Sequence, residues 1–74
     1  MENVFPGRLR KLRKRQRRKQ YAVAELCGLD RKTYGRYERG EKEPSVESLE
    51  KIADYFEVSM DYLRGRTDNP TINR

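Results

Sequence analysis

The apolar residues of this chain recur at intervals of three and four, which is the spacing of short amphipathic helices. The strongest pattern follows Ser45 and carries five apolar residues on one helix face: Val46, Leu49, Ile52, Ala53 and Phe56. We predict that this whole face belongs to the core. No segment alternates between polar and apolar residues as a half-buried strand would. The pattern therefore predicts an all-α chain.

Four further helices are predicted from shorter apolar patterns. Their ranges are 8–16, 20–27, 31–38 and a last helix between Ser59 and Gly65. The residues expected to face inward from them are Leu9, Leu12, Val23, Ala24, Cys27, Tyr34, Tyr37, Met60 and Leu63. Seventy-four residues make one small domain. We place it at residues 8–65, between a flexible lead-in at 1–7, from which Phe5 could dock on the core, and a flexible tail at 66–74.

The ends of these helices carry residues suited to stopping or starting them. Asp30, Ser45 and Ser59 can accept a hydrogen bond from a free amide of the first turn, so we predict them as N-caps. Gly28 fits the left-handed residue that closes a helix. It would make a tight turn between the helices at 20–27 and 31–38.

Charge is unevenly distributed along the chain. The net charge is +6, but residues 1–37 hold 12 Lys/Arg and 3 Asp/Glu, whereas residues 38–74 hold 6 and 9. Nine of the twelve residues from 8 to 19 are basic. The asymmetry favours a surface for a polyanion. The alternative is a solvated, charged face that serves solubility alone.

The predicted helix at 31–38 opens with cations where a helix favours anions. Arg31 and Lys32 stand in its first turn, and each should cost a few tenths of a kcal/mol there. Gly35 costs about 1 kcal/mol relative to Ala in a helix interior. It would leave a smooth patch that permits another surface to approach. Uncompensated costs of this kind indicate a functional site, although an exposed position without function is the alternative.

Several classes of function are disfavoured. His is absent and there is one Cys, so zinc binding and His-based acid–base catalysis are not expected. Cys27 has no His to activate it and is predicted to be a core residue. We therefore expect no enzyme, metal, cofactor or small-molecule substrate. The short apolar runs predict neither a signal peptide nor a membrane span, and we expect a cytoplasmic protein.

Motifs along the chain resemble those of a known family. They are RLRKLR in the first helix, Gln20, Ala24, Gly28, RYERG at 36–40, PS at 44–45 and KIADYFEVSMDYLRG at 51–65. In this order they resemble the phage lambda repressor/Cro-type helix-turn-helix family, also called the xenobiotic-response-element family. The resemblance covers residues 8–65 and implies a compact five-helix domain. Its second and third helices would form the helix-turn-helix, with the third entering the DNA major groove.

The resemblance also implies roles for individual residues. Gln20 would hold a phosphate, Arg31, Lys32 and Arg36 would read base edges, and Thr33 and Arg39 would lie near phosphates. With the basic corner and Gly35 included, the expected DNA-binding residues are Arg18, Lys19, Gln20, Arg31, Lys32, Thr33, Gly35, Arg36 and Arg39. Arg13 and Glu38 would form a structural ion pair. Because Arg and Lys pair well with guanine, a GC-containing half-site is expected.

The chain departs from the family pattern at three places. Arg17 and Arg18 stand where a Gly and an apolar residue are usual, so the Arg18 stem would either fill the core or be exposed. Lys19 replaces the usual Ser/Thr-like N-cap. The loop at 41–43 is mostly acidic, and only Lys42 could contact a phosphate there.

We accordingly predict a sequence-specific transcriptional regulator of bacterial or phage type, a repressor that binds double-stranded DNA as a homodimer and associates with the nucleoid. The final helix and tail, with Tyr62 and residues near Leu63, are the expected dimer interface. The alternative for these residues is that they only cover the core. The alternative is an antitoxin-like interaction module on the same fold. It would bind a partner protein through Leu26, Tyr55 or Tyr62 and regulate its own synthesis.

Overall fold

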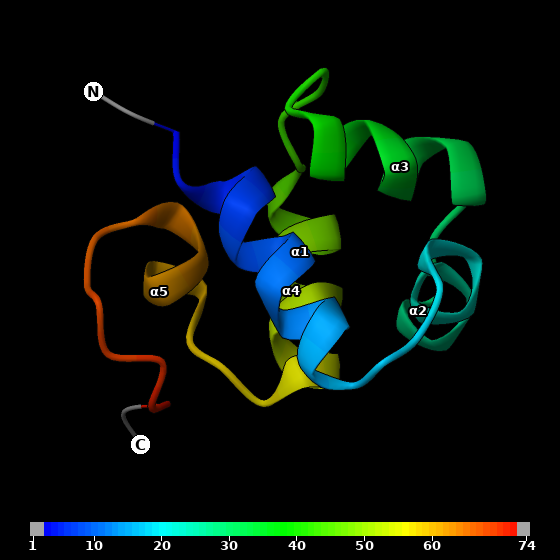
Figure 1. Cartoon of the computed structure of the whole chain (residues 1–74). Coiled ribbons are helices and arrows are strands. Elements are labelled where there is room, and N and C mark those ends of the chain that lie inside the picture. Colours follow the sequence, from blue (N-terminus) through cyan, green and yellow to red (C-terminus); the bar gives the residue numbers. More distant parts are fainter. Residues whose placement is uncertain (1–2, 73–74) are drawn as a thin grey trace.

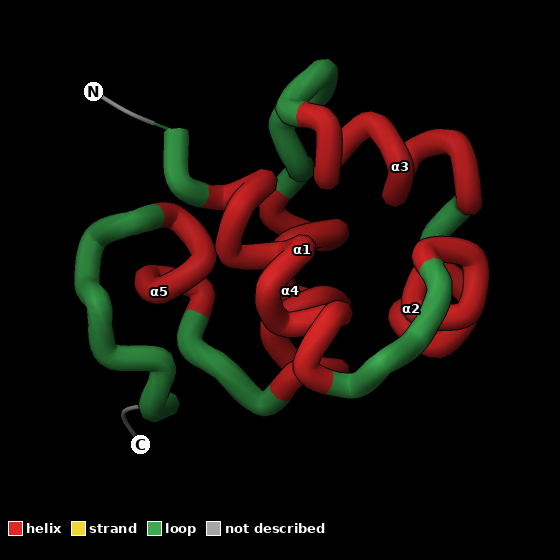
Figure 2. Tube along the Cα trace, viewed as in Figure 1, coloured by secondary structure: helices red, strands yellow, loops and turns green. Residues whose placement is uncertain are grey.

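The computed structural model describes residues 3–72 and contains five α-helices joined by short loops (Figures 1 and 2). They are α1 (Phe5–Arg15), α2 (Gln20–Cys27), α3 (Arg31–Arg39), α4 (Val46–Phe56) and α5 (Met60–Arg64). Within residues 3–72 there is no strand. The prediction of a five-helix all-α domain is confirmed.

The predicted N-caps are all formed. A side-chain oxygen of Asp30 accepts a hydrogen bond from the Thr33 amide at 3.1 Å, and Ser45 does the same for Ser48 at 3.1 Å. Ser59 accepts from the Tyr62 amide at 2.9 Å. Each bond satisfies an amide that the first turn of a helix leaves free.

The helix-turn-helix is closed by the glycine predicted for it. Gly28 follows α2 in the left-handed conformation, with φ of 75°, which a residue without a Cβ adopts at little cost. The Leu29 amide then bonds back to the Ala24 carbonyl at 2.8 Å. The α2–α3 turn therefore takes only three residues.

A single core joins the five helices. The helix α3 packs against α1 and α2, and α5 packs against α1 and α4, with α2 and α5 on opposite sides of the molecule (Figure 1). The buried apolar residues are Phe5, Leu9, Leu12, Val23, Ala24, Cys27, Tyr34, Tyr37, Leu49, Ile52, Ala53, Val58, Tyr62 and Leu63. Every residue predicted to face inward from the shorter helices is in this set except Met60, which packs partly buried against it.

The first helix begins three residues earlier than predicted. Residues 5–7, assigned to the lead-in, form its first turn, where Pro6 is tolerated because no helical partner exists for the missing amide. Phe5 docks on the core as expected, and its ring meets that of Tyr37 edge-to-face with centroids 5.9 Å apart. This aromatic contact ties the start of α1 to α3.

One residue of the strongest apolar pattern does not reach the core. The Val46 side chain is 61% exposed, so its predicted burial is wrong. Val46 is the first residue of α4, and the buried face begins only at Leu49. Periodicity gives the direction of a side chain around the helix, but not whether another element covers that end of it.

The corner between α1 and α2 carries the departures noted in the sequence. Arg17 has φ of 57°, the left-handed conformation for which glycine is usual. Arg18 is exposed, so its stem does not fill the core. Lys19 occupies the N-cap of α2 without a side-chain bond. Neither Arg17 nor Lys19 thus supplies the turn or cap chemistry that is usual at this corner.

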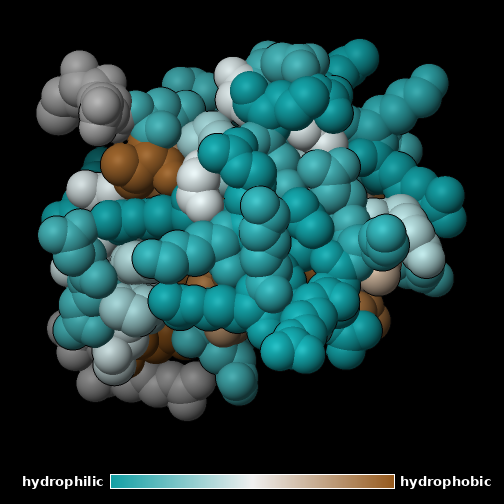
Figure 3. Space-filling view, in the orientation of Figure 1, coloured by the Kyte–Doolittle hydropathy of each residue, from teal (hydrophilic) through white to brown (hydrophobic). Residues whose placement is uncertain are grey.

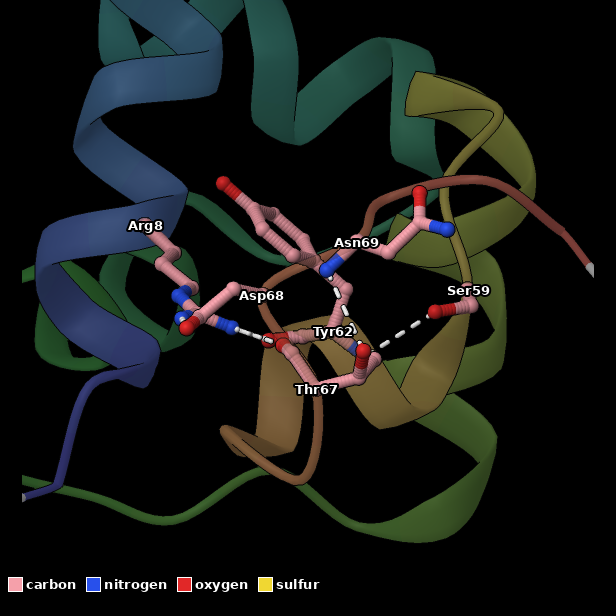
Figure 4. A network of polar contacts seen from close by, with 6 residues as sticks. All are labelled: Arg8, Ser59, Tyr62, Thr67, Asp68 and Asn69. Atoms are coloured by element: carbon pink, nitrogen blue, oxygen red, sulfur yellow. Dashed lines mark hydrogen bonds and ion pairs between the residues drawn. The ribbon is translucent and has the colours of Figure 1, made fainter.

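Residues 66–72 of the predicted flexible tail fold back on the domain (Figure 4); residues 73–74 of that tail and 1–2 of the lead-in lie outside the described residues. The Arg8 guanidinium donates to the Thr67 carbonyl at 2.7 Å and to Asp68 at 2.6 Å, and it also donates to the Tyr62 carbonyl. It lies 4.2 Å from the centroid of the Tyr62 ring. The Ser59 amide donates to the Pro70 carbonyl at 2.9 Å. Tyr62 is therefore buried in the monomer, not exposed as the proposed partner contacts required.

Candidate nucleic-acid interface

The helix α3 has a buried face and a cationic outer face. Tyr34 and Tyr37 are buried at 0% and 2% exposure and fix the rotation of the helix. Arg31, Lys32 and Arg36 are exposed, with Lys32 and Arg36 turned away from the two tyrosines. The three predicted base readers are therefore accessible to solvent, in the first two turns of α3.

The first turn of α3 contains no acidic residue. The nearest carboxylate, Asp30, is engaged by the backbone: the hydrogen bond from the Thr33 amide, followed by the Thr33 hydroxyl and Lys32, holds the pKa of Asp30 below its usual range. The free amides, the positive end of the helix and two cations thus coincide. This is the electrostatic pattern of an anion-binding helix N-terminus.

A buried carboxylate anchors α3 to α1. Glu38 is 1% exposed and accepts from Arg13 through two bonds, Nε to Oε2 at 2.7 Å and Nη2 to Oε1 at 3.0 Å. The expected ion pair is therefore present in bidentate form. Burial raises the pKa of Glu38, but the hydrogen bonds from Arg13 and Gln20 outweigh it and leave the pKa below its ordinary value. Arg10 also donates to the Glu38 backbone carbonyl.

Tyr34 lies in this buried polar region, and its hydroxyl is the one buried side-chain oxygen or nitrogen in residues 3–72 without a well-formed hydrogen bond. Burial, reinforced by the neighbouring Glu38 carboxylate, raises the pKa of Tyr34 beyond its usual range. The phenol therefore stays neutral, and Glu38 remains the single negative charge at the base of α3.

Gln20 connects the same carboxylate to α2. Its amide nitrogen donates to Glu38 Oε1 at 3.1 Å, while the residue remains exposed. The Arg13 guanidinium also donates to the Arg18 carbonyl at 3.0 Å. Through these bonds the predicted DNA-binding residues Arg18, Lys19 and Gln20 lie on a corner that is attached to α3.

Gly35 does not provide the open patch expected of it. It is buried, and a Cβ built there would lie 3.1 Å from Arg39 Nη1 and 3.7 Å from Gln20 Oε1. The Arg39 side chain crosses over the glycine, and its Nε donates to Glu41 at 2.5 Å. Thr33 is half-buried and bonded to Asp30. The space left by the missing Cβ of Gly35 is therefore occupied by the side chains of Arg39 and Gln20.

With this geometry established, comparison with known proteins identifies the family. A family model described as helix-turn-helix matches residues 9–63. The chain belongs to the helix-turn-helix family. The uncharacterised helix-turn-helix transcriptional regulator YobD of Bacillus subtilis is 40% identical over 67 residues, which are 90% of this chain and 60% of YobD. The phage CTXphi repressor RstR of Vibrio cholerae is 42% identical over 59 residues, which are 80% of this chain and 53% of RstR.

Solved structures agree. The P22 c2 repressor, crystallised with a synthetic operator, has a TM-score of 0.77 and 28% identity, and the match covers 85% of this chain and 94% of that one. The predicted resemblance to lambda-type repressor domains is confirmed. The chain spans about half to three-fifths of the length of the curated relatives described.

Two residues of this helix-turn-helix domain were missed by the sequence interpretation. The Tyr21 side chain is 52% exposed, and the Arg31 guanidinium carbon lies 5.2 Å from its ring centroid. Tyr21 falls off the apolar face formed by Val23, Ala24 and Cys27, which was the available signal. Arg10, which reaches the carbonyl of Glu38, had no comparable signal because its partner is 28 residues away.

The outer surface of α1 continues the cationic region. Figure 3 shows this face of the domain as mostly hydrophilic, with a few small apolar areas. The exposed basic residues of α1 are Arg10, Lys11, Lys14 and Arg15. These four members of the predicted basic flank are open to solvent, whereas Arg8 and Arg13 are bonded within the domain.

The other candidate chemistries gain no support. Burial raises the pKa of Cys27 to about 11, so the thiol stays protonated. Residues 3–72 contain no cluster of His, Cys, Asp and Glu that could hold a metal. None of their helices is long and apolar enough to cross a membrane.

The residues predicted for a protein partner are only partly available. Leu26 is 52% exposed, but the Tyr55 hydroxyl donates to Gln16 at 2.5 Å and Tyr62 is buried. Of the three, Leu26 alone offers a free apolar side chain.

Proposed function

We propose that this chain binds double-stranded DNA sequence-specifically, with α3 in the major groove, and that the protein is a transcriptional repressor. The observation that carries the proposal is the exposure of Arg31, Lys32 and Arg36 in the first two turns of α3, a helix fixed by its buried face. The operator in the P22 c2 repressor complex and the repressor function named for RstR support it.

The three cations would read base edges. Arg and Lys donate to guanine O6 and N7, and each good bidentate contact discriminates by about 1–3 kcal/mol. A half-site with guanines is therefore expected. The first turn of α3 would approach the bases most closely, because recognition helices enter the groove with their N-terminal residues.

Flanking residues would hold the backbone. Gln20 keeps a second amide proton after its bond to Glu38, and this proton can be donated to a phosphate. Arg18 and Lys19 would contact phosphates beside it, with Thr33 nearby. Arg39 could join them after leaving Glu41, at little cost because both members of that pair are 53% exposed.

The functional unit would be a homodimer on two half-sites about one helical turn apart. Residues 8–65 would supply the DNA-binding unit, working in the cytoplasm at the nucleoid. Because Tyr62 is covered by Arg8 and residues 66–72, the interface would use the outer face of α5 and this covering segment, without the Tyr62 ring.

Selection of bound sequences from a random duplex pool tests the proposal. The expected result is enrichment of a GC-containing half-site, repeated in inverted orientation. Enrichment of no sequence would overturn site-specific binding. A single half-site without a repeat would overturn the dimer and leave DNA recognition intact.

Salt dependence tests the phosphate contacts separately. The logarithm of the affinity should fall linearly with the logarithm of the salt concentration, with a slope of about −0.9 per phosphate neutralised. Lys19→Ala should reduce the slope by about one. A flat salt response would contradict a polyanionic ligand.

A further inference from the structure

Tyr21 and Arg31 form a contact that bridges the two helices of the helix-turn-helix. Tyr21 is the second residue of α2, and Arg31 is the first residue of α3. The guanidinium carbon lies 5.2 Å from the ring centroid, within the range of a cation–π interaction. Both residues are exposed, so their side chains lie at the surface of the domain.

Arg31 has few other restraints. Within residues 3–72 it makes no ion pair, and Asp30 beside it is occupied by Thr33. An unrestrained arginine would lose much of its side-chain freedom on binding a base. An aromatic face restricts it beforehand. The cation–π contact engages one side of the guanidinium, so the N–H groups directed away from the ring remain available for a bidentate contact.

We propose that Tyr21 is a positioning residue for base recognition: its ring holds Arg31 in the orientation that reads a guanine. This inference rests on the proposed DNA-binding function and adds a specificity determinant to it. Lys32 and Arg36 have no aromatic partner within residues 3–72, so Arg31 alone of the three readers is oriented in this way.

A double-mutant cycle tests the inference, with the duplex recovered by selection and a duplex in which its guanines are exchanged for adenines. Tyr21→Leu should lower affinity for the selected duplex by about two- to five-fold, the range of an exposed cation–π contact. It should affect the exchanged duplex much less. In an Arg31→Ala background, Tyr21→Leu should have no further effect.

Two controls isolate the ring. Tyr21→Phe keeps the aromatic face and should retain wild-type affinity and discrimination. Leu26→Ala, on the same helix and with the same 52% exposure, should change neither. The melting temperature and salt slope should be unchanged in all three variants, since a merely structural role would alter stability and a phosphate contact would alter the salt slope.

The outcomes separate the two proposals. Additive losses for Tyr21→Leu and Arg31→Ala, a gain of affinity in Tyr21→Leu, or a loss in Tyr21→Phe would overturn the positioning role while leaving DNA recognition in place. If Arg31→Ala itself leaves discrimination unchanged, the proposed reading of bases by Arg31 fails, and the role of Tyr21 fails with it.

Discussion

The helices α3 and α4 begin in the same way but carry opposite charges in their first turns. Each is capped by a side-chain oxygen at 3.1 Å from an amide three residues on. The helix α4 has Glu47 in its first turn, paired with Lys51 at 3.7 Å, whereas α3 has Arg31 and Lys32 and no acid. The arrangement in α4 favours its stability, and that in α3 opposes it.

The unfavourable charges in the first turn of α3 are compensated by contacts on its buried face. Its inner face carries the buried Glu38, bonded to Arg13 and Gln20, and the rings of Tyr34 and Tyr37. The inner face of α4 is purely apolar among its buried residues: Leu49, Ile52 and Ala53. The helix α3 is thus held by its N-cap, its inner face and the neighbouring helices, not by the charges of its first turn.

The largest effect should come from removing the buried anchor of α3. Glu38→Gln leaves the largely buried Arg13 without its counter-charge and should lower the free energy of unfolding by about 2–4 kcal/mol. The expected decrease is smaller than for a fully buried ion pair because the Arg13 side chain is 15% exposed. Urea unfolding measures the change. The control Glu50→Gln, on the exposed side of α4, should stay within about 0.5 kcal/mol of wild type.

The pH dependence of stability should follow the same group. Since the folded-state pKa of Glu38 lies below its ordinary value of 4.5, its contribution is present above about pH 4.5 and is lost as the pH falls through the folded-state pKa. Glu38→Gln should make the free energy of unfolding less dependent on pH in this acid range. An unchanged pH profile would show that Glu38 is not a stabilising acid.

The next effect concerns DNA recognition by the outer face of α3. Arg31→Ala and Lys32→Ala should each reduce affinity for the selected duplex by about 1–3 kcal/mol, because each removes donors to a base edge. Affinity for a random duplex should fall much less. The helicity, followed by circular dichroism, should not decrease, since both side chains are exposed. Lys51→Ala on α4 is the matched control. An equal loss on both duplexes would assign the two cations to phosphates instead.

A smaller effect is expected at two residues that hold the left-handed backbone conformation. Arg17 and Glu57 are the two non-glycine residues with positive φ in residues 3–72, at 57° and 56°. Replacing either by glycine should relieve backbone strain and raise the free energy of unfolding by about 1 kcal/mol. Thermal unfolding measures both. Arg17→Gly alone should also weaken binding to a random duplex, if the basic corner faces phosphates; equal binding would place Arg17 outside the interface.

The smallest effect should come from exchanging charge between the two helix starts. Lys32→Glu should stabilise the domain by about 0.3–1 kcal/mol, and Glu47→Lys should destabilise it by a similar amount. Both shifts should shrink at high salt. Melting temperatures at two salt concentrations measure them. If Lys32→Glu destabilises the domain, Lys32 serves the fold and its charge is not evidence of a ligand site.

The sequence by itself determined the features that depend on local backbone geometry. Asp30, Ser45 and Ser59 cap helices, and Gly28 closes the helix-turn-helix, because each acts on amides or dihedral angles within a few residues. The face that α3 turns toward the core was also predictable, since Tyr34 and Tyr37 are its only large apolar residues. The outward position of the three cations follows from it.

The tertiary structure decided what depends on contacts between distant segments. Arg8 packs over the Tyr62 ring and bonds to Asp68, which is 60 residues away in the sequence. The side chains of Arg39 and Gln20 lie close to Gly35. The Val46 side chain is left exposed. Tyr21 meets Arg31 only because the turn at Gly28 folds α2 against α3. Periodicity specifies the face of a residue, but burial and side-chain partners are set by which elements pack together, and this is a property of the whole chain.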